Sequence, residues 1–244
     1  MKPLPELDPQ HLVIYADGAS KGNPGPSGWG AVVVIPHQQV IELGGAHLRA
    51  TNNQMEMMAI MQALRLVASL PGALQICSDS SYVLTGIQQW VPQWQRSNWH
   101  TKEGKPVANL TLWQHFAALV AHKSKTSHIS WIHIPGHAGI AGNERADAIA
   151  SGFASNSPVS LYQGPLLSYG FDPYSLQIHS RKLASKKAKG QKAYSYLSQV
   201  EGVLARHRSW DECQARTSGK SGAKFKKTLN QADEEATIRL WQKS

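Results

Sequence analysis

Residues 13–34 read VIYADGASKGNPGPSGWGAVVV, and they place one aspartate, Asp17, between an apolar run and a loop of glycine and proline. The runs on either side are rich in β-branched residues and end at Gly or Pro, which is typical of short strands. Residues 38–48, QQVIELGGAHL, form a third extended candidate. The stretch therefore predicts that the fold opens with three consecutive strands and that a charge lies where the first one ends.

A helix is expected next, over residues 51–72, because Thr51 or Asn52 can cap it and a Pro-Gly pair closes it. The order along the chain is then three strands followed by α-β-α-α-β-α, which predicts an α/β fold with an antiparallel edge on a partly parallel sheet. Apolar periodicity predicts the later strands at residues 74–78 and 128–135 and the later helices from about residue 80, over residues 109–123 and from about residue 143.

The charge of the chain divides it into a neutral and a basic part. Of the net charge of +9, residues 1–155 hold 10 Lys and Arg against 9 Asp and Glu, whereas residues 156–244 hold 15 against 7. A basic segment most often meets phosphate, in nucleic acid or on an anionic membrane surface. We predict a first domain over residues 1–155, a partly ordered linker over 156–192 and a small basic module over 193–244.

Cysteine content and the first residues bear on location. Cys77 and Cys213 fit neither a disulfide framework nor a zinc-ligand spacing, and a reducing compartment suits them. Residues 1–10 lack the apolar core of a signal peptide, and no run approaches the length of a membrane span. We expect a cytoplasmic, soluble and monomeric protein without membrane contact or an obligate protein partner.

Four carboxylates are candidates for chemistry. Asp17 and Asp79 each follow a short apolar strand, and the ends of neighbouring parallel strands meet at one edge of a sheet. Glu56 lies on the apolar stripe of its helix, where an unpaired carboxylate is costly, and Asp147 lies on a helix of small residues. Taken singly, these acids also fit turn or capping residues, a rim glutamate and a solvated aspartate.

Together the four acids form an oxygen-only set, which suits hard cations. Mg²⁺ binds few carboxylates and retains waters and substrate phosphate oxygens, and Mn²⁺ can take the same sites. Two such ions can activate a water and stabilise the leaving oxygen of a phosphodiester. We therefore predict Asp17, Glu56, Asp79 and Asp147 as metal ligands.

Four motifs resemble those of type 1 ribonuclease H, in the order and spacing of that family. They are YADGASKGNPGPSGWGAVV at 15–33, TNNQMEMMA at 51–59, SDSSYVLTGIQQW at 78–90 and GHAGIAGNERADAIA at 136–150. The resemblance runs from about residue 12 to 153. It implies a five-stranded mixed sheet with helices on both faces, and endonucleolytic cleavage of RNA paired to DNA that leaves 5′-phosphate and 3′-hydroxyl ends.

The resemblance also implies roles for single residues. Asp17 would bridge two Mg²⁺ ions, Asp79 and Asp147 would each hold one, and Glu56 would bind an ion and sense the ribose. His137 corresponds to the mobile histidine of the family. An imidazole titrates near neutral pH and therefore suits a proton shuttle, and the glycines at 136 and 139 allow its loop to move.

Substrate contacts are expected in two further places. A 2′-hydroxyl distinguishes RNA from DNA in the wide minor groove of the hybrid. The resemblance implies that Trp90, Trp94 and Trp99 belong to a basic protrusion that grips the DNA strand, although few cations follow them and ring packing alone explains their spacing. The family positions that touch the hybrid, some of which also fit helix capping, are Gly22, Asn23, Thr51, Asn52 and Asn53.

The C-terminal segment resembles the hybrid-binding module of the same family. Trp210, Phe225, Lys226 and Lys227 match its spacing of aromatic rings and paired lysines, which suits binding without sequence preference. The module normally precedes the nuclease domain, and its opening hairpin is not evident here because the apolar spacing over residues 194–204 predicts a helix. A solvated basic tail, a protein-interaction module and a single-strand binder remain alternatives.

The sequence as a whole predicts a metal-dependent endoribonuclease acting on RNA/DNA hybrids. The alternatives are a non-catalytic hybrid-binding protein and a DNA-cutting resolvase or integrase on the same fold, against which the ribonuclease H motifs argue. We further expect that deletion of residues 156–244 leaves the cleavage chemistry intact, weakens hybrid binding and flattens its salt dependence.

Overall fold

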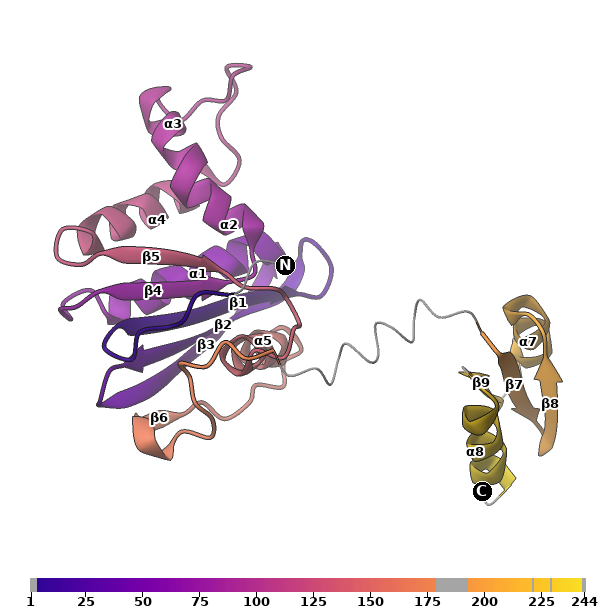
Figure 1. The fold of residues 1–244 in the computed structure, drawn as a ribbon. Helices are drawn as coiled ribbons and strands as arrows, with labels where there is room; N and C mark the ends of the chain where they lie inside the picture. Colours follow the sequence, from indigo (N-terminus) through magenta and orange to yellow (C-terminus); the bar gives the residue numbers. More distant parts are fainter. Residues whose placement is uncertain (1–3, 179–192, 221, 229, 243–244) are drawn as a thin grey trace. The chain divides into compact units, whose positions relative to one another are not determined.

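The three strands predicted at the start of the chain lie together in a mixed sheet (Figure 1). β1 (Leu12–Ser20), β2 (Gly25–Ile35) and β3 (Gln39–Ala50) pair antiparallel, and β4 (Leu74–Ser78) and β5 (Ile129–His133) extend the sheet in parallel from β1. The order is β5-β4-β1-β2-β3-β6. The expected five strands are therefore present, and a sixth short strand, β6 (Gln163–Pro165), adds to β3.

The chain as described here forms two compact units, Met1–Ser180 and Arg181–Ser244. The first unit therefore continues beyond the expected boundary at residue 155. Within the described residues, no helix is both long and apolar enough to cross a membrane. The computed structural model describes residues 4–178, 193–220, 222–228 and 230–242.

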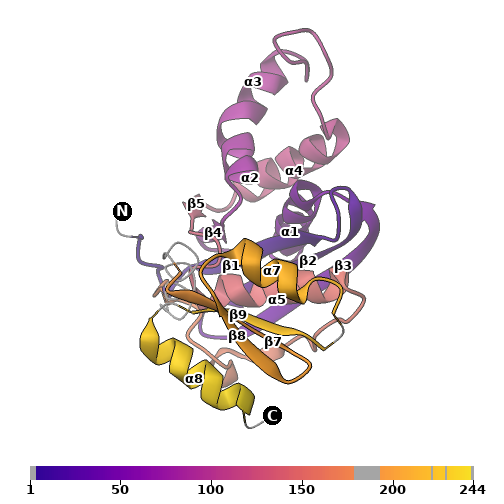
Figure 2. The ribbon, with the colours of Figure 1, turned by 90° about the vertical axis from the view of Figure 1, so that its right-hand side faces the viewer.

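Helices cover both faces of the large sheet, as Figures 1 and 2 show. Alternate residues of β1 separate two cores, since Ile14 faces the cluster with Met57 and Phe116, whereas Tyr15 faces the cluster with Ile149. One face is thus covered by α1 and α4, and the other by α5. The helices are α1 (Asn52–Leu66), α2 (Ser81–Thr85), α3 (Val91–Arg96), α4 (Leu110–Lys123) and α5 (Ala141–Ala154), with a π-helical turn at Gly86–Trp90.

Glycines in β1 and β2 let two helices approach the sheet closely. A Cβ on Gly18 would lie 2.5 Å from the backbone nitrogen of Glu56, and one on Gly30 would lie 2.4 Å from the carbonyl oxygen of Ala146. Only a residue without a side chain fits at such separations. The first contact brings α1 against β1, which carries Asp17, and the second brings α5 against β2 at the residue that pairs with Asp17.

Residues 156–178, which were expected to form part of a linker, pack instead on the α5 side of the first unit. They include β6 and a short 3₁₀ turn, Leu166–Ser168, and their aromatic side chains join the core beneath α5. The rest of the predicted linker, residues 179–192, lies outside the described residues.

Within its described residues, the C-terminal unit is a three-stranded antiparallel sheet with two helices. The strands, in the order β8-β7-β9, are β7 (Ser195–Val200), β8 (Val203–His207) and β9 (Lys224–Thr228), and the helices are α7 (Trp210–Thr217) and α8 (Gln231–Gln242). The prediction of a helix over residues 194–204 is wrong, because β7 and β8 form a hairpin there. Its two-residue turn, Glu201-Gly202, has positive φ at both positions, as tight hairpins require.

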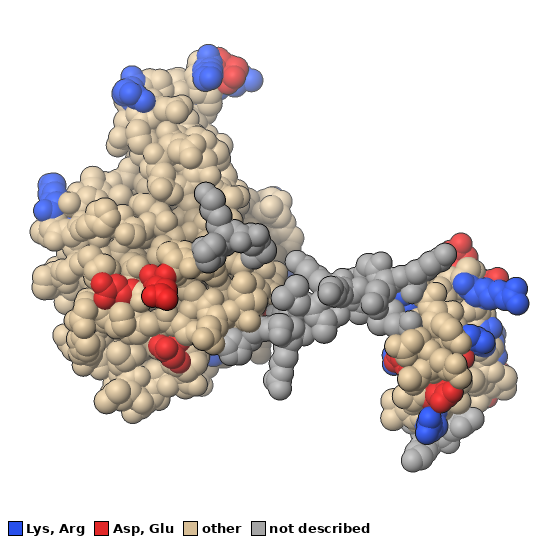
Figure 3. All heavy atoms as spheres, in the orientation of Figure 1, with Lys and Arg blue, Asp and Glu red and all other residues tan. Residues whose placement is uncertain are grey.

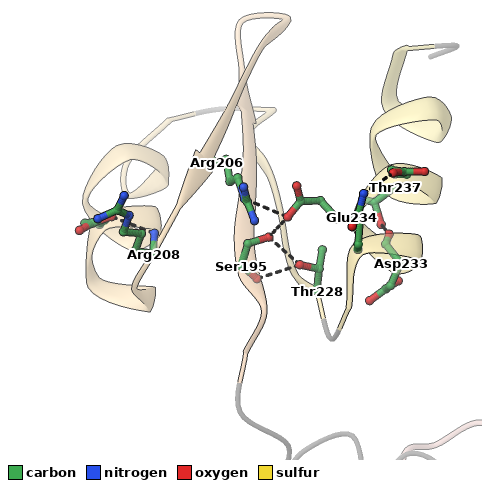
Figure 4. Close-up of polar contacts among 10 residues, drawn as sticks. Ser195, Arg206, Arg208, Thr228, Asp233, Glu234 and Thr237 are labelled. Carbon is green, nitrogen blue, oxygen red and sulfur yellow. Dashed lines mark hydrogen bonds and ion pairs between the residues drawn. The ribbon is translucent and has the colours of Figure 1, made fainter.

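Polar contacts attach α8 to this small sheet (Figure 4). Glu234 pairs with Arg206 of β8 at 3.0 Å and accepts a hydrogen bond from Ser195 of β7. On the other face, Arg216 of α7 donates to Ser198 at 3.2 Å. Successive residues of a strand point to opposite faces, so α7 and α8 cover the two sides of the sheet.

Candidate active site

The five residues predicted to be catalytic line one open cavity of the first unit. Its volume is about 390 Å³, and it is lined by the C-terminal half of the central strand β1 and by residues of α1 and α5. The cavity also includes backbone and side-chain groups of residues 18–20 and Asn52. Its predicted catalytic members are Asp17, Glu56, Asp79, His137 and Asp147.

Different elements bring the carboxylates together. Asp79 directly follows β4, as expected, but Asp17 lies within β1, which continues to Ser20, rather than after the strand. Asp17 pairs across the ladder with Gly30, the residue against which α5 rests. Glu56 comes from α1 and is buried, as its apolar stripe predicts, whereas Asp147 comes from α5 and is partly exposed.

Burial and repulsion shape the electrostatics of the cavity. Burial raises the pKa of Asp17 to about 8, and the carboxylates of Asp79, Asp147 and Glu56 add to the rise, against the Gly18 N–H that lowers it. Burial also raises the pKa of Glu56, although hydrogen bonds from Ser80 and Asn52 oppose this. A cation in the cavity would relieve the repulsion and keep these groups ionised.

Each of three carboxylates has a polar neighbour that sequence reasoning missed. Ser80 donates to Glu56, and the Nδ2 of Asn143 lies 3.4 Å from the Oδ2 of Asp79. Ser151 donates to Asp147 at 3.1 Å. Two signals were available in the sequence, since Ser80 follows Asp79 directly and Ser151 lies one helical turn after Asp147. These contacts orient the carboxylates before any ligand binds.

His137 lies at the mouth of the cavity. Its side chain is 63% exposed, its φ is 53°, and its Nδ1 is 3.8 Å from the Oδ2 of Asp147. The neighbouring Gly136 serves close packing, because a Cβ there would lie 2.6 Å from the Oδ2 of Asp79. The left-handed conformation at Gly139, with φ 83°, favours glycine. The imidazole is therefore open to solvent and lies beside a carboxylate of the cavity.

The donor set of the cavity fits a hard divalent cation. Asp17, Glu56, Asp79 and Asp147 supply carboxylate oxygens only, which Mg²⁺ and Mn²⁺ prefer. Among the described residues, no group of three or more His, Cys, Asp and Glu side chains is close enough to form a ready-made metal centre. Since Mg²⁺ retains waters and takes substrate phosphate oxygens, a wide acidic cavity open to solvent agrees with this ion better than a closed cage would.

The predicted polar contacts to substrate lie beside the cavity. The backbone N–H of Asn52 donates to the side chain of Asn23 in the β1–β2 loop at 3.3 Å, which joins that loop to the start of α1. Thr51 caps α1 by accepting from the N–H of Gln54, so the capping interpretation is confirmed for this residue. Gln54 in turn donates to Asn109, which the sequence did not indicate. Gly22 and Asn53 belong to the same loop and helix start.

The tryptophans form a packed aromatic cluster, as their spacing predicts. The ring of Trp94 lies 5.7 Å from that of Trp90 and 6.5 Å from that of Trp99, and it also contacts Trp113. A groove of about 470 Å³ beside Trp90 and Trp94 extends to Lys102. On the face drawn in Figure 3, several Lys and Arg side chains of the first unit gather where Figure 1 places α3 and the loop after it.

The aromatic residues predicted in the C-terminal unit lie together. Trp210 and Phe225 meet edge to face with centroids 5.4 Å apart, and Tyr196, which the sequence did not indicate, lies 6.0 Å from Trp210. Trp210 and Phe225 are 37% and 55% exposed. The paired lysines separate, because Lys226 points to the opposite face, where its Nζ donates to Asp233 and to Thr237 of α8 at 2.8 Å each. Lys227 follows Phe225 by two residues and so shares its side of β9.

Comparison with known sequences matches the first unit to one family. The family model described as RNase H matches residues 9–155. A Ribonuclease H of Cyanothece sp. is 46% identical over 152 residues, which cover 62% of this chain and 93% of that protein. A Ribonuclease H of Thermosynechococcus vestitus is 45% identical over 150 residues, which cover 61% and 91%.

Comparison with solved structures indicates the same fold. LC9-RNase H1, described as a type 1 RNase H with the type 2 active-site motif, is 25% identical and has a TM-score of 0.54 over 72% of this chain and 84% of that chain. A foamy viral protease-reverse transcriptase solved with an RNA/DNA hybrid is 20% identical, with a TM-score of 0.51 over 64% of this chain and 22% of that one, and it shares the fold.

Proposed function

The chain belongs to the RNase H family of metal-dependent endoribonucleases, and on that premise we propose that it hydrolyses the RNA strand of RNA/DNA hybrids by two-metal-ion catalysis. The observation that carries the proposal is the convergence of four carboxylates, from β1, the end of β4, α1 and α5, on one open cavity. The cavity is acidic, whereas the substrate is an anion. A divalent cation is therefore needed to bring the two together.

The carboxylates have distinct tasks in this proposal. Two bound Mg²⁺ ions, which Mn²⁺ can replace, would activate a water and stabilise the leaving oxygen. Asp17, which is buried and is influenced by the three other acids, is the best candidate to be shared between the ions. Asp79 and Asp147 would hold one ion each, while Glu56, fixed by Asn52 at 2.9 Å, would hold an ion beside the ribose.

Proton transfer falls to His137. Its imidazole is exposed and lies beside Asp147, so it can take a proton at the cavity and release it to solvent. Cleavage would leave a 5′-phosphate and a 3′-hydroxyl. Recognition of the 2′-hydroxyl would fall to the β1–β2 loop and the start of α1, through Gly22, Asn23, Thr51, Asn52 and Asn53. Trp90, Trp94 and Trp99 would support the segment that contacts the DNA strand.

We propose further that the C-terminal unit binds the hybrid. The β7–β8 hairpin removes one objection to its resemblance to the hybrid-binding module. The partly exposed rings of Trp210 and Phe225 suit stacking on a nucleic-acid strand, and Lys227 lies on their side of the sheet. Lys226 points to the opposite face of the sheet and pairs with Asp233, so we assign the phosphate contact on the aromatic side to Lys227.

For location and assembly we propose what the sequence led us to expect. Both cysteines are free and buried, which agrees with the reducing environment of the cytoplasm. We propose that the protein acts there as a monomer.

A substrate panel tests the proposed activity. One labelled sequence is presented as RNA/DNA hybrid, duplex RNA, single-stranded RNA and duplex DNA, with Mg²⁺, with Mn²⁺ and with chelator. We expect cleavage of the hybrid alone, only with metal, and none by Asp79→Asn. Binding of the hybrid without cleavage in either metal would replace this proposal with a non-catalytic hybrid-binding protein.

A further inference from the structure

Residues 157–178, which we call the strap, follow the part of the chain that matches the RNase H family. They leave the end of α5 and run along the α5 side of the sheet (Figure 1). β6 pairs with β3 at three positions, and Tyr162, Leu166 and Tyr169 pack on the core beneath α5. The strap is thus a built part of the first unit.

A buried carboxylate, Glu42 of β3, joins the strap to α5. It is 4% exposed and receives two hydrogen bonds of 2.7 Å from the guanidinium of Arg145 in α5. The strap provides two more donors, the hydroxyl of Tyr169 at 2.6 Å and the backbone N–H of Tyr162 at 2.8 Å. The same Arg145 donates to the carbonyl oxygen of Ser160 at 2.6 Å. Bidentate, charge-assisted contacts of this kind fix geometry.

A second contact ties the strap to the strand of Asp17. The hydroxyl of Tyr15 donates to the carbonyl oxygen of Pro173 at 2.8 Å. The ring of Tyr15 also lies against the first turn of α5, where a Cβ on Gly142 would be 2.5 Å from it. The strap therefore holds β1, β3 and α5 at once, and β1 and α5 carry acids of the cavity.

Arg145 and Asp147 lie on one helix but serve opposite sides of it. Two residues along an α-helix are separated by about 200° around its axis. While Arg145 reaches Glu42 and the strap, Asp147 therefore points toward the cavity, which it lines. A rotation or slide of α5 that loosened the contact between Arg145 and Glu42 would therefore also displace Asp147.

We propose that the strap and the Glu42–Arg145 pair position α5, so that Asp147 and the loop of His137 face the carboxylates of β1 and β4. The inference rests on the proposed function for its catalytic consequence. Arg145, Glu42 and Tyr169 are positioning residues in this account, since none of them lines the cavity. The catalytic unit consequently extends to residue 178, and truncation at residue 155 would damage the chemistry that we expected it to spare.

Single hydroxyl deletions in the full chain test this assignment. Tyr169→Phe removes a hydrogen bond to Glu42, and Tyr15→Phe removes the bond to Pro173. Tyr162→Phe is a matched control, because among the described residues its hydroxyl bonds to the carbonyl oxygen of Pro165, within the strap, and not to Glu42. Arg145→Gln removes the ion pair, and Arg145→Lys restores its charge. Phe116→Leu, in the core on the other face, controls for lost stability.

Two readouts separate positioning from stability. The first is the Mg²⁺ dissociation constant, from an NMR titration of backbone amides without substrate, and the second is kcat and KM for a hybrid, all at a temperature where every variant is folded. We expect Tyr169→Phe, Tyr15→Phe and Arg145→Gln to bind Mg²⁺ more weakly and to lose kcat, by about tenfold for Arg145→Gln, since small displacements of a reacting group are costly. Arg145→Lys should recover part of the loss, and KM should not change.

The proposal is overturned if the strap variants match Tyr162→Phe and Phe116→Leu in Mg²⁺ affinity and in kcat. If Arg145→Gln fails to fold, the two tyrosine variants decide the matter. If the unaltered chain cleaves nothing, the proposed function fails, while the Mg²⁺ titration still reports whether the strap positions Asp147.

Discussion

The contact between β2 and α5 allows one substitution to be worked through quantitatively. Gly30 pairs with Asp17 in the ladder and faces α5. In Gly30→Ala, the new Cβ would lie 2.4 Å from the carbonyl oxygen of Ala146 and 2.7 Å from the Cβ of Ile149. Ordinary contact begins at 3.4 Å, so the helix must retreat by about 1 Å.

The retreat has two consequences of predictable size. Overpacking against helix backbone should lower the free energy of unfolding by about 1–3 kcal/mol. Asp147 directly follows Ala146, so its carboxylate moves away from the cavity with the helix. A displacement of this size should lower the rate of hybrid cleavage on the order of 10- to 100-fold.

Urea unfolding and single-turnover cleavage of a labelled hybrid measure the two effects. Gly170→Ala in the strap is the matched control, because nothing lies within 4 Å of its new Cβ and stability should change by less than about 0.5 kcal/mol. The reasoning is refuted if Gly30→Ala and Gly170→Ala unfold at the same urea concentration and cleave at the same rate.

Three further predictions concern other groups. His137→Ala should lower kcat by about 100-fold while the Mg²⁺ requirement persists, because the variant loses a proton shuttle but keeps every metal ligand. An unchanged pH–rate profile would contradict this. Burial would raise the pKa of Glu42, but hydrogen bonds from Arg145, Tyr169 and Tyr162 outweigh it and hold the pKa below its ordinary 4.5. The stabilisation from Glu42 is therefore present above about pH 4.5 and is lost as the pH falls through its lower folded pKa. The difference in unfolding free energy between the unaltered chain and Glu42→Gln should accordingly shrink in acid. Urea unfolding across that pH range measures it. Trp210→Ala should weaken hybrid binding about tenfold or more by fluorescence anisotropy, whereas Leu240→Ala, exposed on α8, should leave it unchanged.

Much of the first unit could be predicted because local pattern and tertiary structure agree there. β-branched runs bounded by Gly and Pro became β1 and β2, and the apolar stripe of α1 correctly placed Glu56 among buried residues. Asp17 and Asp79 were expected to meet at one edge of the sheet because each was placed at the end of one of two neighbouring strands, and both line the same cavity. The end of β1 was misjudged, because pairing with β2 carries the strand past the charge of Asp17.

The strap could not be predicted, since tertiary contacts rather than local pattern hold it. β6 is three residues of Gln, Gly and Pro with no strand periodicity, and it is ordered by pairing with β3. The role of Glu42 depends on donors from residues as distant as Arg145 and Tyr169. Such a convergence leaves no signal at any one place in the chain.

The hairpin of the C-terminal unit was mistaken for a helix for a physical reason. A strand with one solvated face alternates between apolar and polar residues, but α7 and α8 cover both faces of β7. Buried residues therefore occur at Ser195, Leu197, Ser198 and Val200 without strict alternation. The useful signal was the Glu201-Gly202 pair between two extended runs.

The central claim is that the carboxylate cavity cleaves the RNA strand of a hybrid only through bound divalent ions. The most direct measurement is single-turnover cleavage of the RNA strand in a labelled hybrid by the full chain as Mg²⁺ is titrated from zero. The account predicts no cleavage without the ion and, at low concentration, a rate that rises with about the second power of Mg²⁺, as two ions require. Cleavage that proceeds unchanged in chelator would contradict it.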